Sequence, residues 1–199
     1  MSSEVPQLLL SDVAQWRTWL ADHHGETTGV WLILAKKGTT EPTSLTYDQA
    51  LDEALCQGWI DGQARRRDEG TYQQRFTPRR VRSPWSIRNV GIVARLTAER
   101  RMQAAGLAEV TRAQADGRWA AAYPGPATIE LADDVAAALA DDPKAKVMFD
   151  ILTSQNRYAV LIRINSAKRP DTRARRIAQY VGMLARGETI YPQKRTLAG

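Results

Sequence analysis

The sequence is poor in the two residue types that most often bind metals or form crosslinks. Its 199 residues include one cysteine, Cys56, and two histidines, His23 and His24. A lone cysteine excludes an intramolecular disulfide and a cysteine-rich zinc site. The two histidines are adjacent at what the pattern predicts to be a helix end, which disfavours a histidine-based metal centre. We therefore expect neither a bound metal nor another cofactor.

Long hydrophobic runs are also missing. The longest, Val30 to Ala35 and Val135 to Ala140, are far shorter than the roughly 20 residues that a membrane-spanning helix needs. Leu8 to Leu10 is too short for the apolar part of a signal peptide. We therefore expect no membrane span and a cytoplasmic location. The composition, 43% hydrophobic and 25% charged, is typical of a folded protein.

No sequence motif for a nucleotide-binding loop, a metal site or a nucleophile elbow occurs in the chain. Its charge, however, is unevenly distributed. Residues 59–90 contain eight arginines and three acidic residues, and residues 163–199 contain nine basic and two acidic residues. Because the formal net charge is +6, the rest of the chain is acidic. Such basic segments favour anionic partners. GC-rich coding could also have produced the excess of arginine over lysine, and the arginines would then only form a solvated surface.

Hydrophobic periodicity predicts helices and strands in the first part of the chain. Ser11 is a suitable cap for a helix whose apolar face includes Trp16 and Leu20. The apolar run Val30 to Ala35 is rich in strand-forming residues and apolar on both sides. It therefore predicts a central strand with both faces covered.

A second helix and a hairpin follow. Thr46 and Gln49 have the spacing of a capping box, which predicts a helix start at this point. Residues 59–66 and 71–77 have extended patterns, and the turn-forming residues 68–70 separate them. These two segments therefore predict a β-hairpin.

The remainder of the chain is predicted to be helical. Ser86 can cap a long helix, or a helix pair, that runs to Asp116 and that Gly106 breaks or bends. Glycine and proline within residues 117–126 indicate a linker. Only helical patterns follow it, and the last helix stops at Gly187.

Together these elements predict an α+β fold, with a small antiparallel sheet packed by helices and an all-helical C-terminal part. We expect an α+β domain at residues 1–122, the helical part at 123–187 and a flexible tail at 188–199. Three arginines of the last helix are interpreted as structural, either docked on the acidic surface of the first domain or solvated. They are Arg173, Arg175 and Arg176.

The densest group of functional side chains lies between residues 58 and 89. Arginine binds carboxylates or phosphates with two hydrogen bonds, and indole faces attract guanidinium groups or flat ligands. Hydroxyl groups near a helix N-terminus add donors for an anion. We therefore predict a cleft lined by tryptophan and arginine that binds an anionic small molecule or protein partner. Its residues are Trp59, Asp61, Arg75, Arg79, Arg80, Ser83, Trp85, Ser86 and Asn89.

In this interpretation Asp61 orients one of the two arginines Arg79 and Arg80, and the other is free for the ligand. The same residues also allow a structural interpretation. Trp59 and Trp85 would then belong to the core, Asp61 would pair with an arginine, and Arg79 and Arg80 would bridge the loop to the sheet.

Two other classes of function remain open at this point. An enzyme could use Asp61 as a general base, but a second carboxylate is not evident beside it and Cys56 has no histidine partner there. A nucleic-acid-binding protein could use the basic segments, with Trp59, Trp85 and Tyr72 stacking on bases. No recognisable reader motif supports this second class, so binding of an anionic ligand is preferred.

Several of these segments also resemble a known family. The segments are residues 58–62 (GWIDG), 75–80 (RFTPRR), 83–86 (SPWS) and 172–177 (TRARRI). Together they resemble the YdeI-like family of bacteriocin-protection or OmpD-associated proteins, and the likeness extends over almost the whole chain. The resemblance implies a role in stress or bacteriocin protection, or in association with an outer-membrane protein. It implies no catalytic residues.

Overall fold

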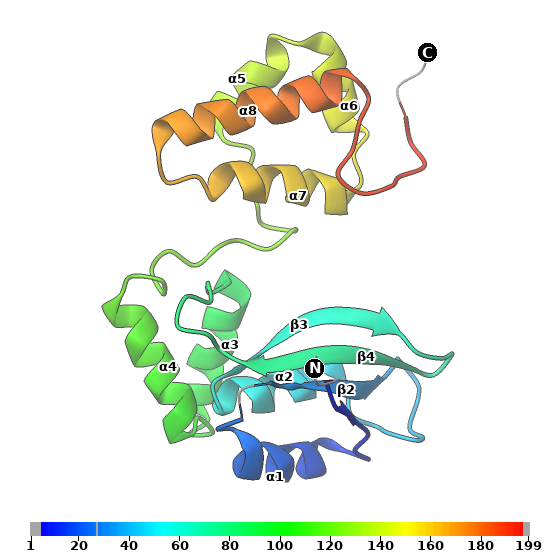
Figure 1. Cartoon of the computed structure of the whole chain (residues 1–199), viewed down its shortest axis with the longest axis vertical. Helices are drawn as coiled ribbons and strands as arrows, with labels where there is room; N and C mark the ends of the chain where they lie inside the picture. Colours follow the sequence, from blue (N-terminus) through cyan, green and yellow to red (C-terminus); the bar gives the residue numbers. More distant parts are fainter. Residues whose placement is uncertain (1–4, 27, 197–199) are drawn as a thin grey trace. The chain divides into compact units, whose positions relative to one another are not determined.

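The computed structural model describes residues 5–26 and 28–196. The chain divides into two compact units, Met1–Tyr123 and Pro124–Gly199 (Figure 1). Each unit has its own hydrophobic core. Among the described residues, no helix is both long and apolar enough to cross a membrane.

The first unit is built on a four-stranded sheet. Its strands lie in the order β1 (Gln7–Leu8), β2 (Val30–Ala35), β4 (Thr71–Pro78) and β3 (Trp59–Arg66). β2 and β3 pair antiparallel with β4, whereas β1 pairs parallel with β2. The sheet is therefore mixed, whereas the sequence predicted an antiparallel one. The parallel strand β1 was not predicted because its two residues are too few to show an alternating pattern.

β3 and β4 form the predicted hairpin. The side chain of Asp68 holds its turn by accepting hydrogen bonds from the backbone N–H groups of Gly70 and Thr71, at 3.0 and 2.7 Å. The register shifts between Asp61 and Ala64, where β3 contains an irregularity. Because β4 pairs with β2 on its other side, the hairpin carries the residues after Thr71 into the centre of the sheet.

Four helices complete the first unit: α1 (Val13–His23), α2 (Tyr47–Cys56), α3 (Ile87–Ala98) and α4 (Ala104–Ala115). The prediction that Ser11 caps α1 is wrong. Asp12 is the N-cap, and its carboxylate accepts a hydrogen bond from the backbone N–H of Gln15 at 3.0 Å. The carboxylate of Asp12 has the reach and geometry for this contact, while Ser11 lies one residue too early.

The other two predicted caps in this unit are confirmed. At α2, the backbone N–H of Thr46 donates to Oε1 of Gln49 at 3.0 Å, as part of a capping box. At α3, Oγ of Ser86 accepts a hydrogen bond from the backbone N–H of Asn89 at 3.1 Å. Both contacts satisfy donors that a helix start leaves unpaired.

Gly106 does not break a helix, as the sequence had suggested. The chain turns at residues 99–103, between α3 and α4, and Gly106 lies inside α4. A Cβ atom at this position would lie 2.2 Å from the backbone oxygen of Cys56. Glycine is therefore required here because α4 passes very close to the end of α2.

The core of the first unit lies against one face of the sheet. Trp16 and Leu20 of α1 pack with Leu32 and Phe76 of the sheet, and all four are fully buried. The indole N–H of Trp16 donates to the backbone oxygen of Ala50 at 3.0 Å. This contact joins α1 to α2 and orients the largest core side chain.

Side chains from neighbouring strands line the other face of the sheet. Ile33 is 5% exposed there, beside Gln73 of β4. The amide of Gln73 donates to the side chain of Gln7 at 2.6 Å and accepts a hydrogen bond from Arg65. The guanidinium of Arg65 lies 4.0 Å from the ring centre of Trp31. The guanidinium of Arg75 lies 6.0 Å from the same ring centre, so polar side chains and two cation–π contacts lie over this face.

The described residues of the second unit form helices α5 (Asp133–Ala140), α6 (Pro143–Asp150), α7 (Ser154–Asn165) and α8 (Pro170–Ala185). Asp142 caps α6 and Pro143 occupies its first turn, as predicted. The α+β class, with helices only in the C-terminal part, is confirmed by the two units. The core of this unit is formed by Val135, Leu139, Met148, Phe149, Leu161, Ile164 and Leu184.

Two arginines of α8 fasten this helix within its own unit. Arg173 forms an ion pair with Asp134 of α5, with an Nε to Oδ2 distance of 2.5 Å. Arg176 donates to the backbone oxygen of Arg163, at the end of α7. The prediction named the first domain or solvent as the surroundings of these side chains, whereas Arg173 and Arg176 contact α5 and α7 of their own unit. The third, Arg175, is exposed.

The segment after α8 forms hydrogen bonds with α7. The side-chain amide of Asn156 in α7 donates to the backbone oxygen of Tyr191 at 2.9 Å, and its oxygen accepts from the backbone N–H of Tyr191 at 2.8 Å. Gln193 contacts Asn156 as well, at 3.0 Å. Tyr191 and Gln193 therefore contact α7 through Asn156, within the region predicted to be a flexible tail. The end of the predicted tail, residues 197–199, lies outside the described residues.

Candidate functional site

A cleft with three arginines opens at one end of the sheet in the first unit. Its volume is about 330 Å³. One side is formed by residues 24–26 and 28, which lie between α1 and β2. The other side is formed by Arg75 and residues 77–80, at the end of β4. We call it the arginine cleft, because Arg75, Arg79 and Arg80 all line it.

Arg79 is a buried cation with incomplete pairing. The residue is 6% exposed, and its guanidinium lies 3.5 Å from the ring centre of Trp85. One nitrogen, Nη1, donates to the backbone oxygen of Pro84 at 3.2 Å, while Nε and Nη2 have no hydrogen-bond partner among the described residues. Burial lowers the pKa of Arg79 to about 10, against a smaller opposing effect of Glu109.

Arg75 and Arg80 complete the positive side of the cleft. Arg75 donates to the backbone oxygen of Thr28, and its Nη1 is buried without a partner among the described residues. Burial lowers the pKa of Arg75 as well. The backbone N–H of Arg80 donates to Oγ of Ser83 at 3.0 Å, but its guanidinium forms no hydrogen bond or ion pair within the described part of the chain. Arg80 is exposed, so its donors are available to a ligand.

The two tryptophans of the predicted cleft are core residues, so the cleft is lined by arginine and not by tryptophan. Trp59 is 0% exposed, and its indole N–H donates to the backbone oxygen of His24 at 3.0 Å. Trp85 is 2% exposed and packs against Trp119, with 4.8 Å between the ring centres. Their large apolar rings are more stable inside the core than at a surface. Trp59 still contributes to the cleft indirectly, because it fixes the backbone of His24.

Asp61 does not orient an arginine of the cleft, which corrects a second prediction. Its carboxylate accepts a hydrogen bond from the hydroxyl of Tyr47 at 2.8 Å. Arg88 donates to the same hydroxyl at 3.1 Å. Burial and the neighbouring Asp61 carboxylate raise the pKa of Tyr47 to about 12. The aspartate therefore takes part in a contact between β3 and the start of α2.

The polar residues Ser83, Ser86 and Asn89 have structural contacts. The hydroxyl oxygens of Ser83 and Ser86 accept hydrogen bonds from backbone N–H groups of the loop and of α3. Asn89 is 5% exposed. None of the three lines the arginine cleft. Sequence reasoning found all three cleft arginines but missed His24, Glu26 and Thr28, which the fold brings from a distant segment without any motif.

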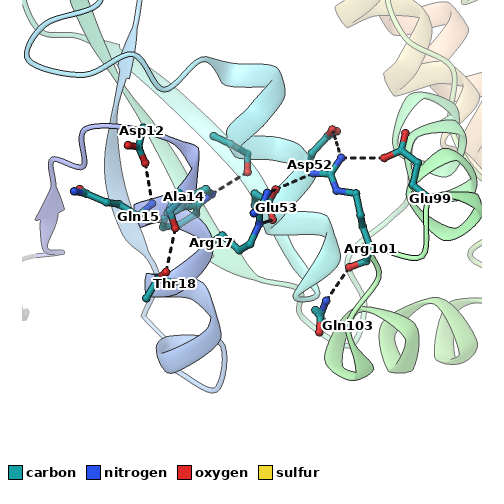
Figure 2. Close-up of polar contacts among 12 residues, drawn as sticks. Asp12, Ala14, Gln15, Arg17, Thr18, Asp52, Glu53, Glu99, Arg101 and Gln103 are labelled. Carbon is teal, nitrogen blue, oxygen red and sulfur yellow. Dashed lines mark hydrogen bonds and ion pairs between the residues drawn. The ribbon is translucent and has the colours of Figure 1, made fainter.

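A second group of charged side chains surrounds Glu53 of α2 (Figure 2). Glu53 is 4% exposed and accepts hydrogen bonds from Arg17, at 2.7 and 3.0 Å, and from Arg101, at 2.8 Å. Burial favours a higher pKa of Glu53, but the hydrogen bonds from Arg17 and Arg101 outweigh it and leave the pKa below its ordinary value. Arg101 also binds Glu99 at 3.0 Å. Glu53 is therefore an ionised anchor for two arginines.

A cavity of about 480 Å³ adjoins this group. Residues from α1, from the end of α2 and from the segment between α3 and α4 form its wall, and they include Cys56. We call it the Glu53 cavity. Sequence reasoning missed it, since its charged residues are far apart in the chain. Among the described residues, no group of histidine, cysteine, aspartate and glutamate could hold a metal ion.

Comparison with protein families assigns each unit separately. The model of a domain of unknown function, DUF8412, matches residues 8–109, just over half of the chain. The chain therefore belongs to the family defined by this domain. The model described as bacteriocin-protection, YdeI or OmpD-associated matches residues 128–187. This match confirms the resemblance to the YdeI-like family for residues 128–187. The predicted extension of that likeness over the first unit is not confirmed, because this unit matches DUF8412 instead. No curated protein and no solved structure matches the chain.

Proposed function

We propose that the chain is a bacteriocin-protection protein of the YdeI type that binds a small dianion in its arginine cleft. The family level of this proposal rests on the match of residues 128–187. The ligand rests on one observation in the other unit, the group of incompletely paired arginines Arg75, Arg79 and Arg80 around a single cleft.

The charge of the cleft favours an anion. Three guanidinium groups line it, and Glu26 is the only carboxylate among the described residues of its lining. Cations that lie in a low-dielectric wall attract an anion more strongly than exposed cations do. Arg79 acts in this way through its buried charge, while Arg80 offers exposed donors for direct hydrogen bonds. The excess of two positive charges suits a phosphate monoester or a dicarboxylate.

The size and polarity of the cleft also favour a small ligand. A volume of about 330 Å³ is at the lower end of the usual range for small-molecule sites. The lining is polar, with Thr28 and Thr77 near the arginines. Nucleic-acid binding through stacking is less well supported, because Trp59 and Trp85 are buried. Catalysis by Asp61 has no support from the cleft either, since Asp61 does not line it.

Isothermal titration calorimetry with inorganic phosphate and with succinate tests the proposal. We expect binding to the wild-type protein and a Kd roughly tenfold higher for Arg80→Gln, which corresponds to about 1.4 kcal/mol. Arg82→Gln is the matched control, because Arg82 is an exposed arginine of the same loop and does not line the cleft. Equal binding by all three proteins would place the anion elsewhere, and no binding by the wild type would refute the ligand class.

A further inference from the structure

The Glu53 cavity is not used by the proposed function and has a chemistry of its own. We propose that it binds a small organic monocarboxylate with an aliphatic part. Its volume of about 480 Å³ falls within the ordinary range for small-molecule sites. The cavity combines cationic, amide and apolar groups in one wall, and the cationic and apolar groups carry this recognition.

The charges around the cavity balance except for one guanidinium. Three carboxylates and three guanidinium groups are joined by ion pairs, namely Asp52, Glu53, Glu99, Arg17, Arg95 and Arg101. Arg100 also lines the cavity, and it has no ion pair or side-chain hydrogen bond within the described part of the chain. One positive charge is therefore uncompensated, which suits a ligand with a single negative charge.

Glu53 also holds two further donor groups at the wall. Figure 2 shows Arg17 and Arg101 reaching Glu53 from opposite sides. The side chain of Glu53 is 5% exposed, whereas that of Arg17 is 58% exposed. Nη1 of Arg17 and Nε of Arg101 have no partner in the described residues, so both remain able to donate. A carboxylate near Arg100 can therefore use pre-oriented donors, which lowers the entropy cost of binding.

The backbone at Arg100 supports a role for its side chain. Its φ is 57°, a left-handed conformation that costs energy for a residue with a side chain. Arg100 follows the end of α3, where proteins commonly use glycine for this conformation. The left-handed backbone at Arg100 therefore raises the free energy of the folded protein, and an interaction made by the Arg100 guanidinium would offset this increase.

The remaining wall suits an aliphatic group. Ala21 of α1 is exposed there, and the lining also includes Leu20 and Cys56, which are 0% and 2% exposed. Burial, helped by the charge of Glu53, raises the pKa of the Cys56 thiol to about 11. The thiol is therefore neutral at pH 7 and behaves as a small apolar group, which does not repel a carboxylate.

Calorimetry with sodium hexanoate tests this site, with hexanamide as the uncharged comparison. We expect hexanoate to bind and hexanamide to bind at least tenfold more weakly. Arg100→Gln should raise the Kd for hexanoate roughly tenfold. Ala21→Trp should abolish binding, because an indole placed at the exposed rim fills the cavity.

Two controls separate this site from the arginine cleft. Arg80→Gln should leave hexanoate binding unchanged, and Arg100→Gln should leave phosphate binding unchanged. Absence of hexanoate binding to the wild type, equal binding of hexanamide, or full binding by both Arg100→Gln and Ala21→Trp would overturn the proposal.

Discussion

The guanidinium of Arg79 lies over the indole ring of Trp85, 3.5 Å from its centre, and both residues are almost fully buried. This contact and the hydrogen bond to Pro84 only partly replace the water that the cation loses. The loss of water lowers the pKa of Arg79 to about 10. Two nitrogens of this buried cation have no partner in residues 5–26 and 28–196, which is costly to the fold, and such a cost is common where a protein keeps a group for binding.

The first prediction concerns this cost. Arg79→Met keeps a long side chain over Trp85 but removes the buried charge, so the free energy of unfolding should not fall and should rise by about 1 kcal/mol. Anion binding should weaken at the same time. Arg79→Ala is the comparison, because it leaves a space beside Trp85 and should lower stability by about 1–3 kcal/mol. Urea denaturation measures both variants, and an equal loss in both would contradict the argument.

The second prediction concerns Glu53. Glu53→Gln removes the anchor of Arg17 and Arg101, and it should lower the free energy of unfolding by about 2–3 kcal/mol at pH 7. This loss is smaller than for a fully buried pair, because the Arg17 side chain is 58% exposed. Chemical denaturation at pH 7 measures it. Glu188→Gln is the matched control, since Glu188 pairs with Arg186 at the surface and should contribute little.

The wild type and Glu53→Gln should also differ in their stability at acid pH. The pKa of Glu53 is lowered in the folded protein, so the unfolded chain binds this proton more tightly. The stabilisation is therefore present above the ordinary pKa of glutamate and is lost as the pH falls below about 4. Stability of the wild type should fall more steeply than that of Glu53→Gln in this range. Parallel curves from pH 7 to pH 3 would show that Glu53 has no such role.

The third prediction uses two helical glycines with opposite surroundings. Gly106→Ala should destabilise the first unit by about 2 kcal/mol or more, because the new Cβ would lie 2.2 Å from the backbone oxygen of Cys56. Gly91→Ala should instead stabilise α3 by roughly 0.5–1 kcal/mol, because the new Cβ would have no described atom within 4 Å apart from its chain neighbours and the adjacent backbone of its own helix. Thermal unfolding distinguishes them. Similar effects of both substitutions would contradict the close approach of α4 to α2.

Local signals in the sequence were sufficient for much of the fold. The capping box at Thr46, the apolar run of β2 and the turn at Asp68 are each contained in a few neighbouring residues, and each predicted its element correctly. Gly106 was misread because its requirement comes from Cys56, which lies far away in the sequence. A short edge strand such as β1 has no periodicity from which it could be predicted.

The candidate sites show the same limit. Arg75, Arg79 and Arg80 were found because arginine clusters in one segment, and the fold keeps them together. Residue type alone did not reveal that Trp59 and Trp85 are buried, because tryptophan suits a core as well as a binding site. The Glu53 cavity depends on contacts between α1, α2 and the segment after α3, which only the tertiary structure brings together.

The last prediction concerns the C-terminal unit. Asn156 is 1% exposed and holds the backbone of Tyr191 with two hydrogen bonds. Asn156→Ala would leave these backbone groups without partners, so it should lower stability by about 1–3 kcal/mol and release the segment after α8. Trypsin should then cut after Lys194 and Arg195 faster than in the wild type, which mass spectrometry of a short digestion detects.

Gln155→Ala is the matched control for this experiment, because Gln155 is the exposed neighbour of Asn156 on α7. Its cleavage rate should equal that of the wild type. If Asn156→Ala also leaves the rate and the stability unchanged, the hydrogen bonds to Tyr191 do not hold the segment. The flexible tail predicted from residue 188 would then be the better description.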